Sequence, residues 1–160
     1  MAARHAHQWL APGEPPIRFD LVPAGSHLGA SGNPFDQAAL GSAERLEIEP
    51  GIVIRHASAP GFLALKLAAY RDRGEDDPFV SHDLEDILAL LASRPGIVAE
   101  AAAAPVDIRT FIAARVELLV GRDDLDDLVA GHLGNIDRRR AAESIASVHR
   151  SLAALAALRQ

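Results

Sequence analysis

Residues 58–70 read SAPGFLALKLAAY, and this stretch decides the fold that we expect of the chain. Ser58 precedes Pro60 by two residues, which is the spacing of a helix N-cap followed by a proline in the first turn. Apolar side chains then recur at helical spacing. We therefore expect a largely buried helix that starts after Ser58 and ends near Gly74. The composition and the periodicity of the sequence change at this helix.

Ahead of this helix the sequence is rich in proline and glycine and carries short runs typical of strands. Strands are expected at residues 6–11 and 17–22, joined by a proline-rich loop. A short helix over residues 34–42 follows. Strands at residues 44–48 and 52–56 then form a hairpin across Pro50 and Gly51, which brings the expected number of strands to four.

After this helix, apolar residues recur every three or four positions, which predicts further helices. One begins after Ser81, and the others cover residues 97–103, 106–120, 124–131 and 136–158. The expected fold class is therefore α+β, with a small mixed or antiparallel sheet in residues 1–57 and a C-terminal helical bundle in residues 58–160. A chain of 160 residues suits a single domain, since cores commonly close at about 100–200 residues.

Composition excludes several classes of function. The chain has no cysteine, so disulfides, thiolate metal sites and a cysteine nucleophile are excluded, and any metal needs oxygen or imidazole ligands. The net charge of -6 argues against a broad DNA-binding surface. No apolar run approaches the roughly 20 residues that span a bilayer. We expect a cytoplasmic bacterial protein without a DNA or membrane partner.

Lys66 is the only lysine of the chain and lies within FLALKLAAY, with apolar residues on either side. Its ammonium must therefore reach the rim of the helix or meet an anion. The first case is a lysine at the edge of a buried stripe. The second is an anion-binding group, which the rarity of lysine in this chain favours.

Three carboxylates are candidates for chemistry. Asp83 and Asp86 are three residues apart on one face of the helix after Ser81, so they can orient a lysine, act as a base or bind Mg²⁺. Acidic residues in a first helical turn are also favoured by the helix dipole alone. Asp20 is the polar residue in an otherwise strand-like apolar segment. Its carboxylate either contributes to a metal or phosphate site or faces solvent as part of the normal alternation of a strand.

Four blocks of the chain, taken in order, resemble consecutive segments of AbiEii-like nucleotidyltransferases, over a match that runs from about Trp9 to Pro95. They are IRFDLVP, GNPFDQAALGSAERLEI, GIVIRHASAPGFLALKLAAYRDRG and SHDLEDILALLASRP. The most specific part is a KLxA element beginning at Lys66, followed across an arginine-bearing loop by a DxxD element at Asp83 and Asp86.

The resemblance implies a nucleotidyltransferase-like fold and a two-metal transfer, with Mg²⁺, of a nucleoside monophosphate from a nucleoside triphosphate (NTP) to a hydroxyl of tRNA or protein. Several members of that family are toxins restrained by an antitoxin. By this resemblance Lys66 neutralises triphosphate charge, and Asp83 orients the lysine or acts near the attacking hydroxyl. Asp86 supports substrate binding, and Asp20 is a further metal-binding carboxylate.

The chain departs from the family at one point, because the Gly-Ser turn and DxD pair that precede these blocks have no counterpart here. Phosphoryl transfer depends on metal ions held by such carboxylates, so their loss should remove most activity. We therefore expect a truncated or inactive nucleotidyltransferase relative, or one half of a split enzyme whose N-terminal half is another chain. The alternative is a non-catalytic interaction module.

Overall fold

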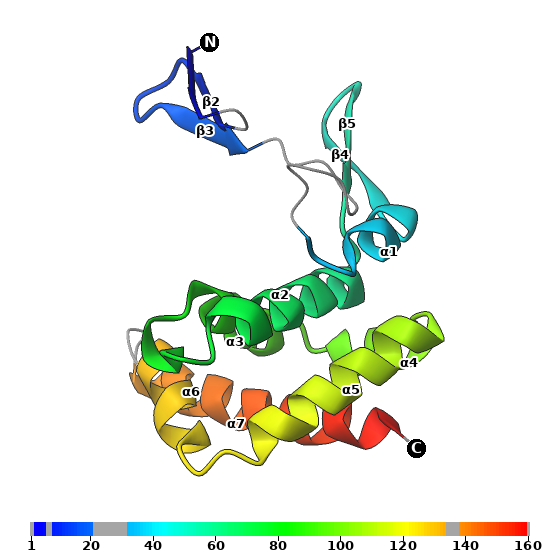
Figure 1. Cartoon of the computed structure of the whole chain (residues 1–160), viewed down its shortest axis with the longest axis vertical. Helices are drawn as coiled ribbons and strands as arrows, with labels where there is room; N and C mark the ends of the chain where they lie inside the picture. The colour runs from blue at the N-terminus through cyan, green and yellow to red at the C-terminus, as the bar shows by residue number, and fades with distance from the viewer. Residues whose placement is uncertain (1, 6–7, 21–31, 134–137, 160) are drawn as a thin grey trace.

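The computed structural model describes residues 2–5, 8–20, 32–133 and 138–159, and it has the expected α+β class (Figure 1). The strands are β1 (Ala2–His5), β2 (Gln8–Ala11), β3 (Ile17–Asp20), β4 (Glu44–Glu49) and β5 (Ile52–His56). The helices are α1 (Asp36–Gly41), α2 (Ala59–Arg73), α3 (His82–Ser93), α4 (Ile97–Ala103), α5 (Val106–Val120), α6 (Leu125–Leu133) and α7 (Arg138–Ala156), with short 3-10 segments η1 (Pro78–Val80) and η2 (Ala157–Arg159).

The strands form two separate antiparallel sheets rather than one. β1, β2 and β3 make a three-stranded sheet in chain order, in which Trp9 lies opposite Phe19. β4 and β5 form a hairpin with Leu46 opposite Ile54. Its turn places Gly51 at φ +80°, and the Gly51 amide donates to the Glu47 carboxylate at 2.9 Å. Only glycine adopts that φ without strain.

The expectation of four strands missed β1. Its sequence, AARH, has neither β-branched residues nor an apolar alternation. It is a strand because its backbone pairs with the neighbouring β2, a contact that the side-chain pattern of β1 itself does not report. The predicted strand at residues 52–56 and the predicted helices at residues 97–103 and 106–120 agree with β5, α4 and α5 in their bounds.

The main hydrophobic cluster is built by helices alone. The apolar faces of α2 to α7 meet in it, and the helix at the end of the chain contributes Val148, Leu152 and Leu155 at the expected spacing of three and four. Its largest fully buried side chains are Leu63, Leu67, Leu84, Ile87, Leu88, Leu91, Ile97, Ile108, Ile112, Leu128, Leu152 and Leu155. The helical body is therefore the part of the fold with a core.

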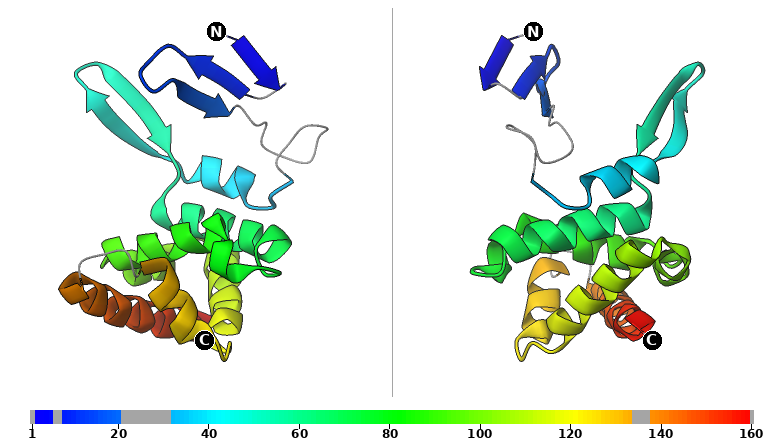
Figure 2. Two further views of the ribbon diagram at one scale, coloured as in Figure 1. Left: turned by 90° about the vertical axis from the view of Figure 1, so that its left-hand side faces the viewer. Right: turned by 45° about the vertical axis from the view of Figure 1, so that its right-hand side comes forward.

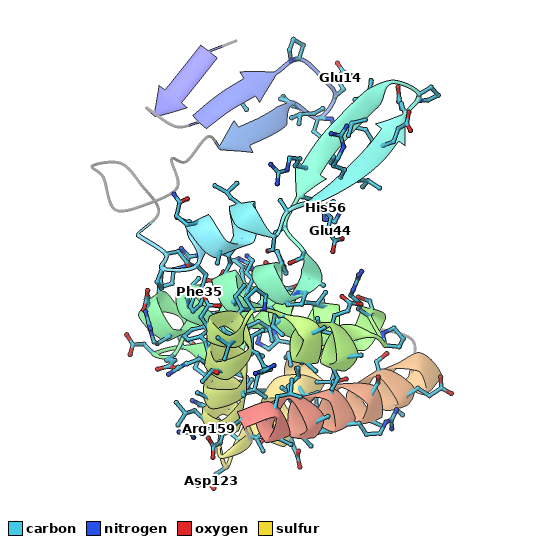
Figure 3. All side chains as sticks on the ribbon, turned by 90° about the vertical axis from the view of Figure 1, so that its right-hand side faces the viewer. Glu14, Phe35, Glu44, His56, Asp123 and Arg159 are labelled. Atoms are coloured by element: carbon cyan, nitrogen blue, oxygen red, sulfur yellow. The ribbon has the colours of Figure 1, made fainter. Side chains whose placement is uncertain are left out.

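The β4–β5 hairpin projects away from the helical body (Figure 2), and every one of its residues is exposed. Its base is marked by His56 and Glu44, whose side chains approach to 3.9 Å (Figure 3). α1 lies between the hairpin and α2 (Figure 1), and the ring of Phe35, just before α1, packs at a tilt of 39° on that of Phe111 in α5, with centroids 4.2 Å apart. In the part of the chain that the structure describes, no helix has the length and hydropathy to cross a membrane.

Candidate functional site

The ends of α2 and α3 place the candidate residues. α2 begins at the expected cap, where the Ser58 hydroxyl accepts from the Gly61 amide at 3.3 Å. α3 begins in the same way, with the Ser81 hydroxyl accepting from the Leu84 amide at 3.3 Å. Asp83 therefore falls in the first turn of α3, on the side that faces α2.

A close approach at Gly74 sets the geometry between these helices. A Cβ at Gly74 would lie 2.4 Å from the Ser81 hydroxyl oxygen and 2.7 Å from the Tyr70 ring. Real Cβ atoms do not come so near, so only glycine lets the chain turn this tightly from α2 to the cap of α3. This turn brings Arg73, the last residue of α2, next to Asp83.

Asp83 is the centre of an ion-pair network. Its side chain is 7% exposed, and it accepts from Lys66 at 3.2 Å. Arg73 donates to both of its oxygens, from Nε at 2.8 Å and from Nη2 at 3.1 Å. Lys66 also contacts the half-exposed Asp86 at 2.5 Å, and its Nζ lies 5.6 Å from the centre of the Phe62 ring. A buried carboxylate is thus shared by two cations from α2.

The network keeps its groups ionised. Burial lowers the pKa of Lys66, but hydrogen bonds to Asp86 and Asp83 outweigh burial and hold that pKa above its ordinary value. Burial raises the pKa of Asp83, but hydrogen bonds from Arg73 and Lys66 outweigh it and hold that pKa below its ordinary value. Each group therefore favours the ionised form of its partner.

The network lies at an open hollow of about 270 Å³ between α1, α2 and α3. Lys66, Arg73 and Asp83 line it, together with Asn33 just before α1, Asp36 at the start of α1, and Asp72. The Asn33 amide donates to the Leu65 carbonyl of α2 at 2.9 Å, and its oxygen accepts from the Phe35 amide. Asn33 therefore ties the start of α1 to the rim of the hollow.

The structure brings together three of the four residues singled out from the sequence: Lys66, Asp83 and Asp86. Asp20 ends β3, opposite Gln8, but its side chain lies outside the described residues. Sequence reasoning did not single out Arg73. The pattern that could have found it is a basic residue in the last turn of a helix that ends ten residues before Asp83.

A magnesium site is not formed by the described side chains. Among them, no three carboxylates or histidines converge as metal ligands. Asp83, the candidate nearest the hollow, has both oxygens engaged by Arg73. The two cations that hold Asp83 also oppose a third positive charge beside it. The described side chains therefore form no metal site here, although three carboxylates, Asp36, Asp72 and Asp83, line the hollow beside its two cations.

No family model matches the chain, and no curated protein or solved structure matches it significantly. The resemblance to AbiEii-like nucleotidyltransferases therefore rests on the sequence blocks themselves.

Proposed function

We propose that the chain is a nucleotidyltransferase-like protein that holds the phosphates of an NTP in the hollow between α2 and α3. One observation supports this proposal above the others. Lys66 and Arg73, two cations from α2, meet at one open hollow and are held there by a single buried carboxylate. Such preorganised donors are suited to phosphate oxygens.

In this proposal Asp83 is a positioning residue. Both of its oxygens are occupied by hydrogen bonds from Lys66 and Arg73, while the Arg73 side chain is 70% exposed and has further N–H donors for a ligand in the hollow. Lys66 exchanges its contact with Asp86, the more exposed of its two carboxylate partners, for a contact with the phosphates. Asp83 stays in place and aims both cations, so it aligns the triphosphate without touching it.

Nucleotide transfer itself needs groups beyond these. Since the described side chains do not form a magnesium site, no metal-dependent step is assigned to them. The acceptor class of tRNA or protein, and an antitoxin or a separate N-terminal half as partner, rest on the resemblance alone.

The test is NTP binding by Lys66→Met, which removes the ammonium and keeps the apolar stem. Calorimetric titration of the whole chain with each of ATP, GTP, CTP and UTP, with and without Mg²⁺, should show saturable binding of at least one. Loss of one charge-assisted contact, worth about 1.5–3 kcal/mol, should weaken that binding about tenfold or more. The matched control is Arg94→Met, since Arg94 pairs with Glu100 at 2.9 Å outside the hollow.

The proposal is wrong if no NTP binds, or if Lys66→Met lowers thermal stability while leaving NTP affinity unchanged. In that case the network serves only to join α2 to α3.

A second candidate function, a non-catalytic interaction module, is favoured by the β4–β5 hairpin. Leu46, Ile52 and Ile54 are between 41% and 49% exposed, and the pairing of Leu46 with Ile54, together with the alternation along β5, places them on one face. A two-stranded hairpin is marginally stable alone, and clustered exposed apolar side chains mark contact surfaces. This function would be favoured if the chain bound no NTP and its sedimentation mass increased with protein concentration. The Ile54→Lys substitution should then lower that mass.

A further inference from the structure

A second pocket, of about 230 Å³, lies between the end of α2 and the C-terminal half of α5. It shares no lining residue with the hollow at Lys66. Leu67, Leu118 and Leu119 form its apolar side. Its polar side has Tyr70, Arg115 and Arg122, together with Glu75. Nothing in the proposed nucleotide site uses these groups.

The Tyr70 hydroxyl is the unexplained group of this pocket. Tyr70 is 3% exposed, and its hydroxyl is a buried polar atom without a hydrogen-bond partner among the described residues. Buried polar groups are almost always bonded, so the Tyr70 hydroxyl at this pocket wall is a donor that an acceptor entering the pocket, a water or a ligand, would satisfy. Burial raises the pKa of Tyr70, which keeps the hydroxyl protonated and able to donate.

The two arginines differ in how firmly they are held. Arg122 makes a two-point contact with Asp124, at 2.7 and 2.8 Å. Arg115 is only 16% exposed and contacts the 44% exposed Glu75 through Nη2. A guanidinium has five N–H donors, so Arg115 retains donors for an anion even with Glu75 in place.

We propose that this pocket binds a small carboxylate with a short apolar chain. The carboxylate accepts from the Tyr70 hydroxyl and the Arg115 guanidinium, and the chain packs on Leu67 and Leu118. Glu75 and Asp124 offset the two arginines, so a monoanion fits the local charge better than a phosphate dianion does. The volume lies below the roughly 300–1,000 Å³ of pockets for drug-sized ligands, which limits the ligand to a few carbons.

The test uses sodium butyrate as the probe and the single tyrosine as the reporter. The ring resonances of Tyr70 in the tyrosine-labelled whole chain should shift saturably with butyrate, and sodium chloride at equal ionic strength should not move them. Calorimetry should show butyrate affinity at least tenfold weaker in Tyr70→Phe and in Arg115→Met. Arg94→Met, with its guanidinium outside this pocket, should bind as the unchanged chain does.

Several outcomes would overturn the carboxylate assignment. They are butyrate shifts no larger than those with chloride, tighter binding of inorganic phosphate than of butyrate, or full butyrate affinity in Tyr70→Phe. If Tyr70→Phe does not fold, Arg115→Met decides alone. Because the two pockets share no residue, butyrate binding does not depend on whether an NTP binds at Lys66.

Discussion

At the scale of single residues, the buried Asp83 pairs with two cations, Lys66 and Arg73. We expect Asp83→Asn to destabilise the chain by about 2–3 kcal/mol, because breaking a buried ion pair leaves partners uncompensated. Lys66 and Arg73 are partly exposed, so water solvates their freed charges and reduces the loss of stability. Chemical denaturation followed by circular dichroism measures the change.

The control for this change is Asp86→Asn, one helical turn along α3. Asp86 is half-exposed, so its loss should cost less than about 1 kcal/mol. Acid titration gives a second readout. The folded-state pKa of Asp83 lies below the ordinary 3.8, so its stabilisation is present above that pH and is lost as the pH falls through the folded-state pKa. The stability of Asp83→Asn should therefore fall less on acidification than that of the unchanged chain. If stability fell equally with pH in both proteins, the role given to Asp83 would be contradicted.

At the scale of elements, the turn from α2 to α3 decides the site. We expect Gly74→Ala to destabilise the chain by about 1–3 kcal/mol, the usual cost of forcing atoms into a filled space. The new Cβ would push on the Ser81 hydroxyl and the Tyr70 ring, which disturbs the cap of α3 and both pockets. Thermal unfolding measures the loss of stability, and NTP titration measures the loss of binding.

Gly41→Ala is the matched control, since a Cβ at Gly41 meets no atom within 4 Å. Gly41 ends α1, so alanine there should be neutral or slightly stabilising, by up to about 1 kcal/mol. Equal effects of the two substitutions would show that the close approach at Gly74 is not what holds α2 and α3 together.

At the scale of the whole molecule, stability is unevenly distributed. The helices from α2 to α7 share one cluster of buried side chains, whereas the β4–β5 hairpin has no buried residue. We expect hydrogen exchange, followed by mass spectrometry, to be fast in residues 44–56 and slow in α2, α3 and α5, whose amides open only on global unfolding. Hairpin amides as protected as those of α2 would show that another surface covers the hairpin.

Local sequence pattern was enough for the α+β class and for most helix bounds. Caps, prolines and apolar spacing are properties of neighbouring residues, which is why α4 and α5 were placed from the sequence and why Ser58 and Ser81 were expected as helix starts. The same local logic placed Asp83 and Asp86 on one face of α3 and marked Lys66 as the single lysine. It could not establish a family, and the nucleotidyltransferase assignment stays a proposal.

What the sequence by itself determined about this protein is thus which segments are helices and which residues are candidates. Only the tertiary structure decided that the strands form two separate sheets, that β1 exists, and that Arg73 joins Lys66 at Asp83. The orphan hydroxyl of Tyr70 also belongs to this second group. The physical reason is that strand pairing, ion pairing and burial depend on which residues of different segments come within a few ångströms, and the pattern within one segment contains no such distances.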